Sequence, residues 1–130
     1  MALGKIKADT LEHSTAGTVD TQYVVKGSAK SWINFNATGT IATRDSFNVS
    51  GIVDEKTGIT TVSFTNNMQT NANYATMMGG HDIADSEDFN SQHIFVNRFT
   101  SSNYIVQNCN SASAAADWEL NNAANFGDLA

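Results

Sequence analysis

One five-residue turn constrains the fold of this chain more than any other feature. Asp54–Gly58 separates two β-rich runs, and the second of them, Ile59–Thr65, is dense in Thr, Val, Ile and Phe. Such residues favour strands, and glycine tolerates the positive φ angle that a tight hairpin requires. We therefore predict a β-hairpin with Gly58 in a left-handed conformation.

Alternation of apolar and polar residues with a period of two extends this pattern along the chain. In Ser28–Asn36, Ile33 and Phe35 share one face, and Trp32 lies on the opposite face. This periodicity indicates a half-buried strand. The other expected strands are Thr21–Val25, Thr38–Thr43, Ser46–Val53, Tyr74–Met78, Gln92–Phe99, Asn103–Asn108 and Asp117–Asn122. Ala112–Ala116 is the only plausible short helix, but the alternation that follows it favours a closing strand instead.

These strands predict an all-β class: a small antiparallel β-sandwich, jelly-roll-like, of about seven or eight strands. Asn, Thr and Ser supply 41 of the 130 residues, and this composition disfavours helices because these side chains compete for backbone hydrogen bonds. Residues 1–20 hold few large apolar groups, so we expect an extended N-terminal arm before a sandwich domain over residues 21–130. Within the arm, Ser14–Gly17 is a predicted turn.

Charge and cysteine usage argue against several partners. The net charge is −6 and Lys and Arg number seven, which is unfavourable for binding nucleic acid or an anionic membrane. The sequence shows neither a long apolar run nor a signal peptide, which predicts synthesis in the cytoplasm. The single cysteine, Cys109, cannot form an internal disulfide, and we expect it to be a small buried side chain.

The best candidate for ion or receptor chemistry is an acidic loop beside His81. Its carboxylates could hold Ca²⁺, which prefers six to eight oxygen ligands. The order of acidic residues of an EF-hand loop is missing, however, and a solvated loop is the simpler interpretation. The acidic residues of this loop are Asp82, Asp85, Glu87 and Asp88.

Catalytic and cofactor motifs are missing from the sequence. His13, His81 and His93 lack the spacing of a zinc site, and the chain has no G-x-S-x-G nucleophile motif. We therefore expect no enzyme activity, no metal and no cofactor. Trp32 and Trp118 could stack on sugars, but Trp32 faces away from the core, and we favour a subunit interface for it.

Two short segments, residues 30–36 and residues 44–50, carry a resemblance to a known group of proteins. They resemble a domain of tail-fibre and other virion proteins of phages, notably marine and cyanobacterial ones. The resemblance covers Lys5–Gly80, and the sequence after Gly80 departs from it. It implies a β-rich module at the surface of a virion, often trimeric, with no catalytic motif to carry over.

These observations together predict a structural virion protein, either a short fibre or a capsid-decorating protein. We expect it to form a homotrimer and to bind other virion proteins of the capsid or tail. The alternative is a lectin-like module that recognises host surface glycans. A small hydrolase is disfavoured because no paired carboxylates can be identified. The expected interface residues are Leu3, Ile6, Leu11 and Trp32.

Overall fold

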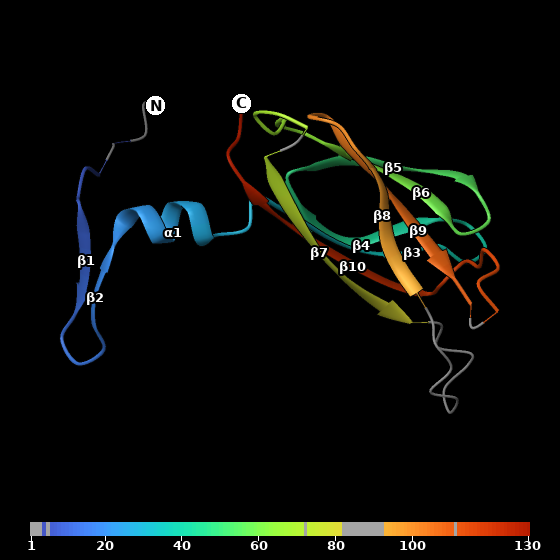
Figure 1. Ribbon diagram of the computed structural model, residues 1–130, viewed down its shortest axis with the longest axis horizontal. Coiled ribbons are helices and arrows are strands. Elements are labelled where there is room, and N and C mark those ends of the chain that lie inside the picture. The colour runs from blue at the N-terminus through green and yellow to red at the C-terminus, as the bar shows by residue number, and fades with distance from the viewer. Residues whose placement is uncertain (1–3, 5, 72, 82–92, 111) are drawn as a thin grey trace.

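The computed structural model describes residues 4, 6–71, 73–81, 93–110 and 112–130. Eight strands form a sandwich of two antiparallel four-stranded sheets, which confirms the predicted all-β sandwich (Figure 1). One sheet has the order β4-β3-β10-β7 and the other β5-β6-β9-β8. The strands are β3 Ser31–Asn36, β4 Ala42–Phe47, β5 Val49–Lys56, β6 Ile59–Phe64, β7 Tyr74–His81, β8 His93–Phe99, β9 Asn103–Cys109 and β10 Leu120–Gly127.

The core between the sheets comes from alternate residues of the central strands. Ile33 and Phe35 of β3 are buried while Trp32, the residue before Ile33, is exposed, so the predicted alternation of this strand is confirmed. Burial of the tyrosine side chain raises the pKa of Tyr74, which borders the core, to about 12. The buried core cluster consists of Ile33, Phe35, Ala37, Val62, Phe64, Met68, Tyr104, Val106 and Ala123.

The predicted hairpin is confirmed as the β5–β6 connection. Gly58 has a φ angle of 70°, and Val53 of β5 is paired with Thr61 of β6 in an antiparallel register. Cys109 is buried and free, as expected. The turn is shorter than the predicted segment Asp54–Gly58, because β5 continues to Lys56 and only Thr57 and Gly58 connect it to β6.

The prediction of one strand over Ser46–Val53 was wrong, because the chain passes from one sheet to the other at Asn48. Its φ angle of 55° ends β4 at Phe47, and β5 then begins at Val49 in the other sheet. Its side-chain amide donates to the carbonyl oxygen of Lys30 at 2.9 Å, and its side-chain oxygen accepts from the Asn66 amide at 2.7 Å. Asn tolerates a left-handed conformation, and these bonds hold the corner between the sheets.

Two other boundaries also differ from the prediction. The strand expected at Thr38–Thr43 begins only at Ala42, because Thr38 instead donates its backbone amide to the Asn36 side chain at 3.0 Å in a local turn. In the closing segment, Trp118 and Asn121 are both buried and Asn122 is exposed. The expected alternation from Asp117 was wrong because β10 starts at Leu120, after a bend at Glu119.

Thr21–Val25 is helical, which corrects the prediction of a strand there. The helix α1 covers Thr21–Gly27 and follows a two-stranded hairpin of β1 Thr10–His13 and β2 Gly17–Asp20. Among the described residues, β1 and β2 pair only with each other, so the segment that follows β2 has no strand beside it to pair with. A helix satisfies its backbone groups internally, which overrides the strand preference of its β-branched residues.

A buried amide pair joins the two sheets. Asn108 of β9 donates to the side-chain oxygen of Asn121 of β10 at 2.6 Å, and Asn121 donates to the carbonyl oxygen of Trp118 at 2.7 Å. Both side chains are almost completely buried. Because both side chains are buried away from water, the Asn108 amide nitrogen and the Asn121 side-chain oxygen depend on each other for this hydrogen bond.

We expect the two asparagines to be energetically coupled. Asn108→Ala and Asn121→Ala each leave one buried amide group without its partner, whereas the double variant removes both groups. The summed destabilisation of the single variants should exceed that of the double variant by about 1 kcal/mol. Urea unfolding of the four proteins measures this difference, and strict additivity would show that the pair is not coupled.

Candidate interaction surfaces

The first surface belongs to the N-terminal unit, by which we mean β1, β2 and α1. This unit stands apart from the sandwich at one end of the molecule (Figure 1). Its hairpin residues are all exposed, and α1 buries none of its residues. One hollow of about 390 Å³ lies between β1 and α1, and we call it the N-terminal hollow. Its apolar lining residues are Ile6, Ala8, Leu11, Val24 and Val25, and its polar lining residues are Lys7, Asp9 and Thr21.

These side chains are exposed although they are large and apolar. Ile6 is 93% exposed, Leu11 46% and Val25 60%. Leu11 lies opposite Val19 across the hairpin, and Val19 is itself 41% exposed. A cluster of exposed apolar side chains of this kind usually marks a surface that contacts another molecule.

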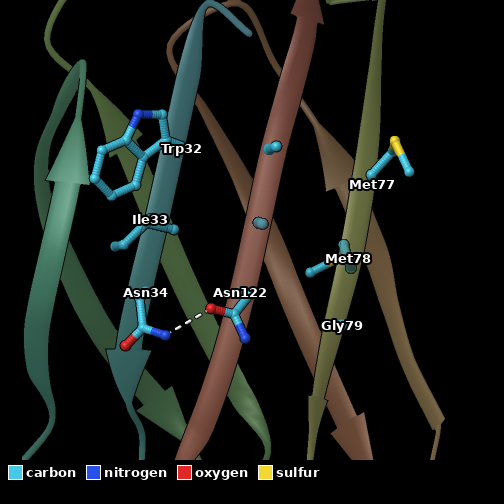
Figure 2. Close-up of a pocket in the computed structure, with 9 residues that line it drawn as sticks. Trp32, Ile33, Asn34, Met77, Met78, Gly79 and Asn122 are labelled. Atoms are coloured by element: carbon cyan, nitrogen blue, oxygen red, sulfur yellow. Dashed lines mark hydrogen bonds between the residues drawn. The ribbon is translucent and has the colours of Figure 1, made fainter.

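The second surface is the outward face of the β4-β3-β10-β7 sheet. Cross-strand pairing aligns four side chains in one row: Trp32 lies between Phe47 and Ala124, and Met77 lies on the other side of Ala124. We call these four residues the apolar row. Met77 is 68% exposed and Trp32 37%, and Figure 2 shows the two side chains on opposite sides of β10.

A polar row runs parallel to the apolar row, two residues further along each strand. It consists of Asp45, Asn34, Asn122 and Gly79, again paired across four strands. Asn34 donates its side-chain amide to the Asn122 side-chain oxygen at 2.6 Å (Figure 2). The face therefore combines an aromatic platform with fixed amides, an arrangement that can bind either a protein or a sugar.

The structure brings together only some of the residues that the sequence singled out. Ile6 and Leu11 share the N-terminal hollow, whereas Trp32 lies on the separate sheet face. Trp118 is only 1% exposed, which contradicts its suggested use as a sugar-stacking platform. Leu3 and the acidic residues Asp82, Asp85, Glu87 and Asp88 lie outside the described residues.

Four of the large apolar side chains on these surfaces were missed by sequence reasoning. Val24 and Val25 were assigned to a strand, so their position beside Ile6 could not be expected. Met77 alternates with the inward-facing Met78, and this alternation within β7 was the available signal. Phe47 was grouped with Val49 because the corner at Asn48 was not recognised.

Within the described ranges, no group of three or more His, Cys, Asp or Glu side chains is placed to hold a metal ion. Over the same part of the chain, no helix is long and apolar enough to span a membrane. Comparison of the sequence and structure with known protein families, curated proteins and solved structures finds no match.

Proposed function

We propose that this chain is a non-enzymatic structural protein of a phage virion, which forms a short fibre or a capsid-decorating protein at the virion surface. It assembles as a homotrimer through its N-terminal unit and docks to other proteins of the capsid or tail. The virion assignment is supported by the resemblance over Lys5–Gly80. The mode of assembly is supported by the exposed apolar side chains of the N-terminal unit.

The N-terminal hollow carries this proposal. A two-stranded hairpin and a seven-residue helix are marginally stable on their own in water. Packing an apolar face against another surface normally supplies the missing stability, yet Leu11 and Val25 face solvent in the isolated chain. A neighbouring subunit that covers the hollow would supply this packing.

Light scattering of the purified full-length protein tests the proposal. Three copies of the 13.9 kDa chain give about 42 kDa, and Leu11→Lys should convert this species into monomers. Thr18→Lys is the matched control, because Thr18 pairs with Glu12 on the opposite face of the same hairpin. Monomeric wild-type protein at all concentrations, with no antibody labelling of purified virions by electron microscopy, would contradict the proposal.

Glycan recognition is the second candidate function, and one observation favours it. Trp32 lies beside the hydrogen-bonded pair Asn34–Asn122, and sugars commonly require an aromatic face with nearby hydrogen-bonding groups. In this case Trp32→Ala should abolish binding to a glycan array while the mass in solution stays unchanged. Binding that survives Trp32→Ala would exclude this face as the glycan site.

A further inference from the structure

One edge strand of the sandwich lacks the features that normally keep an edge from pairing with another chain. The edge strands of the two sheets are β4, β5, β7 and β8. An edge strand exposes unpaired backbone amide and carbonyl groups, which proteins protect with β-bulges and charged residues. We infer that the unprotected edge, β7, pairs with β1 of a second copy of this chain. This inference rests on the proposed function, because it names the surface that receives the N-terminal unit during assembly.

β-Bulges occur on three of the four edge strands. Each shift of register in the two sheets leaves an extra residue on an edge strand: Arg44 on β4, Ser50 and Glu55 on β5, and Asn97 on β8. Such bulges bend the edge and interrupt the row of backbone groups that a further strand would need. By contrast, β7 pairs with β10 over eight consecutive residues without a shift. The outer edge of β7 is therefore regular along its whole length.

Charged side chains distinguish the four edges in the same way. β4 contains Arg44 and Asp45, β8 contains Arg98, and β5 ends with three charged residues, Asp54–Lys56. β7 contains no Asp, Glu, Lys or Arg. Among the described residues, β10 is the only strand that pairs with β7. A regular and uncharged edge of this kind is suited to accept a strand, because only another extended backbone satisfies its row of amides and carbonyls.

The strand that β7 accepts is β1 of another copy. All residues of the β1–β2 hairpin are exposed, and among the described residues the two strands pair only with each other. A two-stranded hairpin is marginally stable in water, and a third strand supplies the missing stability. β1 lies further from its own sandwich than β2 does (Figure 1), so β1 is the strand that is free to reach another molecule.

Pairing of β1 with β7 also brings apolar side chains together. Leu11 lies opposite Val19 within the hairpin, and Met77 ends the apolar row at β7. A register with Leu11 opposite Met77 continues this row across the subunit boundary. Apolar side chains that lie opposite each other on one face stabilise a pair of strands. The one carboxylate of β1, Glu12, meets no like charge on β7.

The symmetry of the assembly follows from the two unlike strands. Because β1 of one copy binds β7 of the next, the interface is heterologous and closes into a ring by rotation. A ring of three copies uses every β1 and every β7, which agrees with the proposed homotrimer.

An exchange of charges between the two strands tests the inference in the full-length protein. Leu11→Lys and Met77→Glu should each give monomers, because each places a charge opposite an apolar side chain. The double variant with both substitutions should again form a species of about 42 kDa, three times the 13.9 kDa chain. In it, the ammonium group of one copy lies opposite the carboxylate of the next copy. Light scattering measures the mass, and circular dichroism checks that each variant is folded.

The matched control combines Leu11→Lys with Phe47→Glu. Phe47 is 55% exposed and ends the same apolar row on β4, at the opposite edge of the sheet, so this double variant should remain monomeric. The inference fails if Leu11→Lys with Met77→Glu stays monomeric, or if Phe47→Glu restores the trimer equally well. In both cases a trimeric wild type with a monomeric Leu11→Lys variant would leave the proposed assembly standing. A monomeric wild-type protein would overturn both.

Hydrogen exchange gives a second readout that needs no substitution in β7. Alternate amides of an antiparallel edge strand point away from the neighbouring strand and exchange readily with solvent. In the wild-type trimer these amides of β7 should exchange at least about tenfold more slowly than in the Leu11→Lys monomer. The amides of β4 should exchange equally in the two proteins. Equal exchange at β7 in a trimeric wild type and the monomer would overturn the inference while the proposed assembly stands.

Discussion

Trp118→Ala lowers the free energy of unfolding by about 4 kcal/mol, the largest effect that we expect from a single substitution in this chain. Trp118 is the largest fully buried side chain, at 1% exposure. Its carbonyl oxygen accepts hydrogen bonds from the Ala37 amide at 2.9 Å and from the Asn121 side chain at 2.7 Å. Because both bonds hold the backbone in place, the structure cannot collapse fully into the cavity that the substitution leaves.

Trp32→Ala is the matched comparison for Trp118→Ala. Trp32 is 37% exposed, so its loss should lower the free energy of unfolding of the monomer by about 1 kcal/mol or less. Both substitutions should be measured by urea unfolding in the Leu11→Lys background, because assembly would otherwise add a concentration-dependent contribution to stability. Equal losses for the two tryptophans would show that Trp118 does not lie in a tightly packed interior.

Gly58→Ala should cost about 3 kcal/mol of unfolding free energy for two independent reasons. The φ angle of 70° at Gly58 is unfavourable for any residue with a Cβ atom. A Cβ atom there would also lie 2.6 Å from the Asn108 carbonyl oxygen and 2.8 Å from the Ala116 amide nitrogen. These contacts involve backbone atoms, which cannot move aside as a flexible side chain can.

Gly39→Ala separates the two causes. Gly39 also has a positive φ angle, 64°, but a Cβ atom at this position would meet nothing within 4 Å. Its substitution should therefore cost only the conformational strain, about 1 kcal/mol. Thermal unfolding of both variants gives the comparison, and a similar loss for the two would mean that the loop around Ala116 yields easily to the new methyl group.

The sequence alone predicted the local structure correctly where turn-forming residues and the alternation of apolar and polar residues indicate the same element. The preferences of a few adjacent residues predict three features: the turn at Gly58, the residues of β3 that face the core, and the burial of Cys109. A period of two identifies which residues share a face, because side chains alternate along any strand. The sandwich class was predictable for the same reason, since short strands between turns must pack two sheets together.

The corner at Asn48 and the helix at Thr21–Gly27 required the tertiary structure. Asn48 ends β4 through hydrogen bonds with Lys30 and Asn66, each 18 residues away in the sequence. Thr21–Gly27 forms a helix and not a strand because, among the described residues, neither strand of the preceding hairpin pairs with this segment. Neither partner can be identified from neighbouring residues, so propensity alone gave the wrong element.

The candidate surfaces, like the fold, were determined partly by the sequence and partly by the tertiary structure. The sequence by itself determined that Trp32 faces away from the core, because alternation within one strand decides the side on which a residue lies. Only the tertiary structure decided that Trp32 aligns with Phe47 and Met77, and that Trp118 is buried. Pairing between strands depends on register and on the closing of the sandwich, and these bring together residues that are far apart in the chain.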